Sequence, residues 1–109
     1  MIQTEIYQAI EALAEGRVHA LVAPQGTAVP YLVHSLPSRT SDDAMAGMGA
    51  IRCRVQLDAY ADSQLEADQL LEGAIDVLDP LNPGDLMQLQ DYEKETGLYR
   101  ATAELTIWH

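Results

Sequence analysis

Residues 51–78 constrain the fold of this chain more than any other stretch, because two different hydrophobic periods follow each other there. From residue 51 to residue 59 apolar and polar side chains alternate strictly, which is the period of a half-buried β-strand. From residue 67 to residue 78 leucines and alanines recur every three or four positions, which predicts an amphipathic helix. Ser63 stands three residues before Glu66, the spacing of a helix-capping box. Such a strand and helix need a partner sheet.

The segments before this stretch can supply part of that sheet. An apolar stripe predicts a helix that begins near Thr4 and stops at Gly16, because glycine accepts the left-handed conformation that ends many helices. We expect strands at residues 17–23 and 30–36. Pro37 then either ends the second strand or forces it to the edge of the sheet, since proline lacks a backbone N–H.

The segments after it supply two more strands, at residues 86–92 and 98–108, joined by a polar turn that ends at Gly97. The order α-β-β-β-α-β-β predicts an α+β fold, with a mostly antiparallel sheet of about five strands and two helices packed on one face. We expect one domain over residues 1–109, long enough for a single core. The residues expected to join helix and sheet in that core are Val55, Leu57, Leu70, Leu71, Ala74, Ala103 and Leu105.

Residues 38–49 form the segment that least resembles a core element, with small residues, glycines and two methionines. Connections of this length are usually functional or disordered, so we expect a mobile loop that contacts a partner. The alternative is a hairpin tip without a function. The candidate interface residues for a neighbouring subunit or a tube are Arg39, Met45 and Met48 in the loop, and Arg52 and Arg54 on the polar face of the following strand. The two strand arginines could instead form salt bridges with acidic neighbours.

Acidic residues outnumber basic ones by 17 to 6, which gives a formal net charge of −11. This charge repels nucleic-acid phosphate and argues against a generic DNA- or RNA-binding module. Part of it lies on the polar face of the predicted helix at residues 66, 68, 72, 76 and 79, with no basic residue among them. That face has three possible roles: a solvated exterior, a charged wall of an assembly, or a mimic of DNA phosphate.

No recognisable set of catalytic or cofactor-binding residues emerges from the sequence. His19, His34 and His109 stand in different elements without metal-ligand spacing, although His19 and His34 could meet across paired strands as a weak indication of a metal site. Cys53 is a single cysteine on an apolar strand face, where a buried small hydrophobe is expected. We therefore expect neither an enzyme nor a cofactor or metal. No stretch is long and apolar enough to cross a membrane, and no secretion signal is expected.

The chain resembles the small tail-completion proteins, or tail terminators, of long-tailed bacteriophages, prophages and gene transfer agents. The resemblance spans nearly the whole chain and rests on an ordered set of short stretches rather than on one motif. These are the N-terminal helix, Pro-Tyr-Leu-Val at 30–33, Arg-Val-Gln-Leu-Asp-Ala-Tyr at 54–60, Asp-Ser at 62–63, Glu-Ala at 66–67, Leu-Leu at 70–71, Val-Leu at 77–78, Asp-Tyr-Glu at 91–93 and Gly-Leu-Tyr-Arg at 97–100.

That resemblance implies a sheet with two helices packed against it and a structural role. Members of such a family form a homo-hexameric ring on the end of the tail tube, where the ring stops tube growth and offers a surface for the head. The implied partners are further copies of the chain, the tail tube protein and a head–tail connector protein, with DNA only as cargo through the ring. The implied location is the virion tail, after assembly in the bacterial host cytoplasm. The family provides no catalytic residues to transfer.

Two other functions remain open at this point. One is an acidic DNA-mimicking inhibitor, which the acidic helix face and the net charge of −11 favour. The other is a small-molecule-binding α+β domain, which requires a pocket with convergent polar groups. The mass of the purified protein, with and without tail tubes, separates the three functions.

Overall fold

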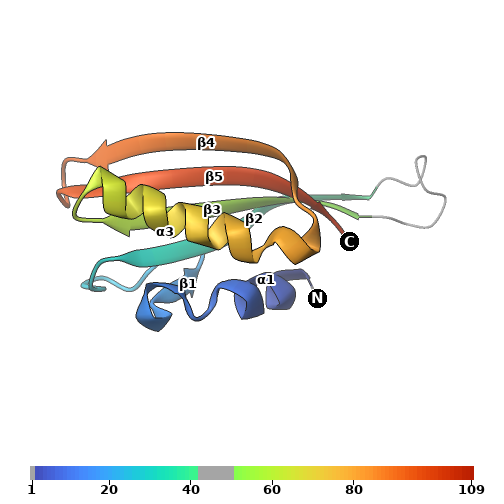
Figure 1. The fold of residues 1–109 in the computed structure, drawn as a ribbon, viewed down its shortest axis with the longest axis horizontal. Coiled ribbons are helices and arrows are strands. Elements are labelled where there is room, and N and C mark those ends of the chain that lie inside the picture. The colour runs from blue at the N-terminus through green and yellow to red at the C-terminus, as the bar shows by residue number, and fades with distance from the viewer. Residues whose placement is uncertain (1, 42–50) are drawn as a thin grey trace.

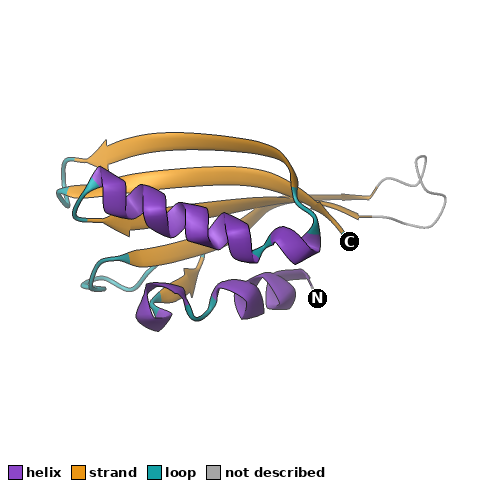
Figure 2. Ribbon diagram, viewed as in Figure 1, coloured by secondary structure: helices purple, strands orange, loops and turns teal. Residues whose placement is uncertain are grey.

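The computed structural model describes residues 2–41 and 51–109, in which a five-stranded sheet carries α1 and α3 on one face (Figures 1 and 2). This confirms the predicted α+β class. The elements are α1 (Ile2–Ile10), the 3-10 turn η1 (Leu13–Gly16), β1 (Val18–Ala20), β2 (Tyr31–Ser41), β3 (Ile51–Ala61), α3 (Gln64–Val77), the 3-10 turn η2 (Asp79–Leu81), β4 (Gly84–Glu93) and β5 (Leu98–Trp108).

The strand order is β1-β2-β3-β5-β4, so that β3 lies at the centre of the sheet and β4 at one edge. All neighbours are antiparallel except β1, which runs parallel to β2. Antiparallel pairing places residues that stand opposite each other on the same face of the sheet. Leu57 pairs with Ala103 and Asp58 with Thr102, so the register of β3 and β5 decides which side chains share each face.

The core lies between the sheet and the two helices. The alternation in β3 directs Cys53, Val55 and Leu57 toward the helices, where each is fully buried. The helix α3 buries Leu71 and Ala74 against them, and Ile2, Ile6 and Ile10 of α1 belong to the same cluster. The predicted core is confirmed, with Leu70 packed at its margin as a partly buried residue. The Ser63 hydroxyl accepts a hydrogen bond from the Glu66 amide at 3.2 Å, which is the predicted cap of α3.

The N-terminal helix differs from the prediction at both ends. It begins at Ile2 rather than Thr4 and ends at Ile10, where its stripe of fully buried isoleucines also ends. A 3-10 turn follows, in which Ala14 and Glu15 take left-handed φ values of 52° and 56° that a continuous helix cannot contain. The expected glycine stop is present as Gly16, with φ of +84°.

The predicted end of the second strand was wrong, because β2 continues past Pro37 to Ser41. The register of β2 against β3 shifts between Ser35 and Ser38, so Pro37 lies in a bulge that requires no ladder hydrogen bond from its nitrogen. β1 pairs with β2 only from Leu32 to His34. In the described part of the chain, the rest of β2 is therefore an edge of the sheet on the side away from β3. The loop predicted at residues 38–49 is therefore wrong for residues 38–41, and its remainder lies outside the described residues.

Candidate assembly surface

The sheet face opposite the helices, called here the open face, carries polar side chains in its middle. Asp58 is 6% exposed there and accepts three side-chain hydrogen bonds. Its Oδ1 accepts from Arg100 Nε at 2.9 Å and from Thr102 Oγ1 at 2.6 Å, and its Oδ2 accepts from Gln56 Nε2 at 2.9 Å. Burial lowers the pKa of the Arg100 guanidinium, but the charge and hydrogen bond of Asp58 outweigh burial and raise it. This group of residues joins β3 firmly to β5.

A hollow of about 350 Å³ lies beside this group on the open face. The rings of Tyr31 and Tyr60 stack at 4.8 Å between centroids, and the Arg100 guanidinium lies 5.8 Å from the Tyr60 ring centroid. Burial raises the pKa of both tyrosines. The exposed side chains of Leu21 and Val22 also line the hollow. The hollow therefore combines a fixed polar floor with an apolar rim.

The edge strand β4 adds apolar side chains to the open face. Met87 pairs with Glu104 and Leu89 pairs with Thr102, which stands beside Asp58 on that face. Leu89 is 53% exposed, and Met87 and Trp108 are also exposed. Large apolar side chains that gather at the margins of a polar face are typical of a surface that a partner covers.

Of the five candidate interface residues the structure describes three, which lie at one end of the β2–β3 pair but not all on one face. Met45 and Met48 lie outside the described residues. Arg54 is engaged internally: its Nη1 donates to Asp85 O at 3.0 Å and to Thr106 Oγ1 at 2.9 Å, and its Nε lies 3.9 Å from Glu104. Arg39 pairs with Cys53 and so lies on the helix face, whereas Arg52 pairs with Trp108 and lies on the open face. Both are exposed and have no ion pair with the described residues.

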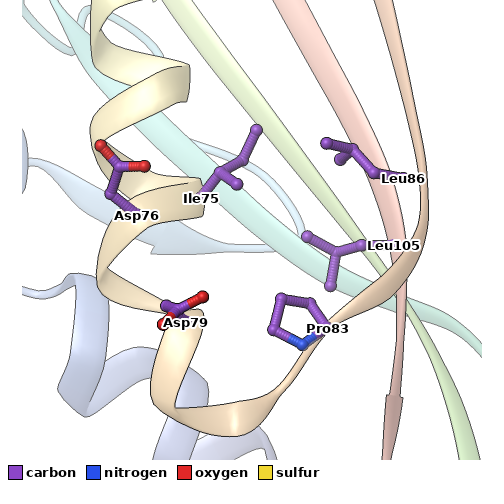
Figure 3. Close-up of a pocket in the computed structure, with 6 residues that line it drawn as sticks. All are labelled: Ile75, Asp76, Asp79, Pro83, Leu86 and Leu105. Carbon is purple, nitrogen blue, oxygen red and sulfur yellow. The ribbon is translucent and has the colours of Figure 1, made fainter.

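A groove runs between α3 and β4 on the helix face, called here the helix–strand groove. At its first hollow, of about 460 Å³, Ile75, Leu86 and Leu105 meet between the helix and the strand, with Asp76 and Asp79 on the helix side (Figure 3). Two further hollows continue along α3 and are lined by Glu72, Gln88 and Gln90, among others. The floor of the groove is apolar, and its helix wall is acidic.

The family model of the tail completion protein gp17 matches residues 7–109. The chain belongs to this tail completion family. Among solved structures, a chain in "Virion of native gene transfer agent (GTA) particle" is similar in fold, with a TM-score of 0.58 and 17% sequence identity over 94% of this chain and 90% of that chain. No curated protein matches the chain.

The tail completion fold separates the two histidines that the sequence suggested as a weak metal site. His19 pairs with Val33 and His34 with Ala20, and consecutive residues of β2 point to opposite faces of the sheet. His34 therefore lies on the helix face, where its ring centroid is 5.9 Å from that of Tyr7. The two histidines therefore do not meet across the paired strands, which removes the weak indication of a metal site there. Over the residues that the structure describes, no group of three or more His, Cys, Asp or Glu side chains is placed to hold a metal. In the same residues no helix is long and apolar enough to span a membrane.

His34 is expected to make the stability of this tail completion domain depend on pH. Its Nε2 is buried without a hydrogen-bond partner in the described residues, and burial lowers its pKa below 6.5. The unfolded chain therefore binds the proton more tightly, so His34 is expected to reduce the free energy of unfolding as the pH falls below 6.5. Urea unfolding at several pH values gives the free energy of unfolding of the natural chain and of His34→Gln. The difference between the two at each pH is the contribution of His34. Parallel pH profiles for the two proteins would contradict the assignment.

Proposed function

We propose that this protein is a structural part of a phage-type tail. It forms a homo-hexameric ring on the end of the tail tube, ends the growth of the tube and offers the surface to which the head connector joins. The observation that carries the proposal is the match of the tail completion family over residues 7–109. The similarity in fold to a chain of a gene transfer agent virion supports a place in a virion. The location that we propose is the virion tail, after assembly in the host cytoplasm.

The surface of the molecule suits a part that other proteins cover. Leu21, Val22 and Leu89 are exposed around the open face, and their burial by a tube or connector protein stabilises an assembly in proportion to the apolar area removed from water. The net charge of −11 suits a ring through which DNA passes as cargo, because acidic walls do not adhere to phosphate. The role needs no catalysis, cofactor or membrane.

The mass of the assembly tests this function. Light scattering after size exclusion is expected to give six times the 11.9 kDa of the chain for the assembly released from purified tail tubes. Electron microscopy of particles that lack the protein is expected to show tails of irregular length. A protein that stays monomeric or dimeric with tubes present, and leaves tail length unchanged when absent, contradicts the proposal and favours the acidic inhibitor.

Leu89→Glu is expected to impair tail completion without unfolding the monomer, because Leu89 is exposed at the margin of the open face. A buried leucine contributes about 1.5–3 kcal/mol to an interface, so its loss weakens the contact about tenfold or more. The readout is the fraction of tails of uniform length after complementation. Leu65→Glu is the matched control, since Leu65 is 68% exposed on α3, away from the open face. Uniform tails with Leu89→Glu would place the contact elsewhere.

A further inference from the structure

We infer that the free edge of β4 is a docking site for an extended segment of another tail protein, in which basic side chains alternate with apolar ones. The segment joins the sheet as a further strand, through backbone hydrogen bonds with Gln88 and Gln90. That the partner belongs to a tail rests on the proposed function, whereas the docking edge follows from the pairing of the strands alone.

β4 is the outermost strand of the sheet on its side (Figure 1), and it extends beyond the helix layer. α3 packs on β3 and β5, and every residue of β4 is exposed except the half-buried Glu93. Its apolar side chains lie on both faces, with Leu86 on the helix face and Leu89 on the open face. A long exposed edge strand of this kind is a template for pairing with another chain.

The pairing of the strands determines which backbone groups of β4 face outward. Ile51 and His109 exchange two backbone hydrogen bonds, of 3.0 and 2.9 Å, so the odd-numbered residues of β5 direct their N–H and C=O groups toward β3. These directions alternate along a strand, so the even-numbered residues of β5 face β4, where they pair with its odd-numbered residues. Gln88 and Gln90 therefore direct their N–H and C=O groups away from the sheet.

Two side-chain hydrogen bonds agree with this direction. The N–H of Tyr92, a further even-numbered residue, donates to Oδ1 of the preceding Asp91 at 2.8 Å. The side chain of Gln90 donates from Nε2 to Asp68 Oδ2 at 2.8 Å on the helix face, so it does not cover the edge. In the described residues β4 pairs with β5 alone. The outward backbone groups of Gln88 and Gln90 are thus open to a partner strand.

The opposite edge of the sheet has features that prevent such pairing. β1 has only three residues, and beyond it β2 contains Pro37 in a bulge. Short edge strands, prolines and bulges are means by which proteins protect the edges of their sheets. β4 contains neither proline nor lysine, and its bulge is confined to its first residues, between Gly84 and Met87. The later part of β4 is therefore the edge that can accept a strand.

The charge beside this edge selects a basic partner. Gln88 lines a hollow of the helix–strand groove together with Glu72 and Asp76, and no basic residue of the described chain lines that hollow. Neither carboxylate has an ion pair with the described residues. Long basic side chains on the helix face of an added strand can extend toward these acids. On the open face the same strand lies beside Leu89, which favours apolar side chains there.

A second copy of the chain fits this edge less well. Antiparallel pairing of two β4 strands through Gln88 and Gln90 places Asp85 of one copy opposite Glu93 of the other. Like charges in opposed positions destabilise a sheet, and each copy carries a net charge of −11. The occupant that the edge favours is therefore a different and more basic protein.

Peptide binding to the full natural chain tests the edge. The probe is a capped peptide of alternating valine and lysine, as long as β4, and its affinity is measured by fluorescence anisotropy. We expect saturable binding, with NMR shifts of the backbone amides concentrated at Gln88 and Gln90. The control peptide has the same composition in two blocks, valines and then lysines, and is expected to bind about tenfold more weakly. Equal affinity for the two peptides would mean general attraction between opposite charges and would overturn the inference.

Gln88→Pro blocks the edge without removing a hydrogen bond to β5, because the N–H of Gln88 points away from the sheet. It is expected to weaken binding of the alternating peptide by about tenfold or more. Gln88→Ala keeps the N–H and is the matched control, with an affinity expected within about threefold of the natural value. Unfolding curves verify that both variants fold.

A second measurement uses the natural chain, so it does not depend on the folding of a variant. Two alternating peptides are N-methylated, one at the valine amides and the other at the lysine amides, so that each loses the donors of one edge. At least one of them is expected to bind about tenfold more weakly than the unmethylated peptide. Undiminished binding of both methylated peptides would show that no strand is added to β4.

The outcomes separate this inference from the proposed function. A natural chain that forms a ring on tail tubes but does not bind the alternating peptide overturns the docking edge and leaves the capping ring standing. A natural chain that binds the peptide at β4 but never forms a ring with tail tubes overturns the capping ring, and the docking edge then serves a partner outside the tail.

Discussion

Replacing Leu71 with Ala is expected to lower the free energy of unfolding by about 2–5 kcal/mol, the range for a large aliphatic side chain removed from a packed core. Leu71 is 2% exposed and lies on the face of α3 that packs on β3 and β5. The substitution removes contacts on both sides of the layer and leaves a cavity that the rigid sheet cannot fill. Urea unfolding followed by circular dichroism measures the loss.

Leu65→Ala is the matched control for that measurement, because Leu65 is a leucine of the same helix that is 68% exposed. It is expected to change the free energy of unfolding by less than about 0.5 kcal/mol, as ordinary surface substitutions do. A loss at Leu71 as small as that at Leu65 would mean that α3 does not pack on the sheet as described.

Asp58→Ala is expected to cost about 1–3 kcal/mol in the free energy of unfolding, because it removes the acceptor of three hydrogen bonds and leaves buried donors without a partner. The Arg100 side chain is 28% exposed and keeps part of its hydration, which limits the loss. Chemical denaturation of the purified variant measures the difference.

Asp58→Asn separates the contribution of the hydrogen bonds from that of the charge, because it keeps an acceptor oxygen and the side-chain shape but removes the charge. The expected loss in the free energy of unfolding lies between those of the natural chain and Asp58→Ala. Glu11→Ala removes an exposed carboxylate outside the hydrogen bonds to Asp58 and serves as the control. If Asp58→Ala were as stable as Glu11→Ala, the hydrogen bonds to Asp58 would contribute nothing net to the fold.

The parts of the fold that the sequence predicts well are those with a strong hydrophobic period. β5 has the predicted bounds, Leu98–Trp108, and α3 begins after the predicted Ser63 cap, because both elements have one face in the core. β2 was predicted too short because Pro37 usually ends a strand, and only the pairing with β3 reveals the bulge that accommodates it. The prediction therefore fails where tertiary pairing overrides a local preference.

The open face was predictable only in part, for a related reason. Alternation in β3 places Arg54 and Asp58 on the polar face, but it cannot identify their partners. Arg100 stands 42 residues from Asp58, and the two meet only because β3 and β5 pair in one register. In β4 the alternation of Met87 and Leu89 with glutamines was visible, but both faces of an edge strand are exposed, so the period alone does not say which face the apolar residues occupy.

The position of β5 in the sheet sets an order of events during synthesis. β5 follows the other strands along the chain, yet it lies between β3 and β4. A nascent chain can form α1 and the β2–β3 hairpin early, but the other edge of β3 has no neighbour until residues 98–108 have left the ribosome. During that interval the unpaired backbone edge of β3 is open to pairing with another nascent chain. The strand at the centre of the finished sheet is thus an edge strand until synthesis ends.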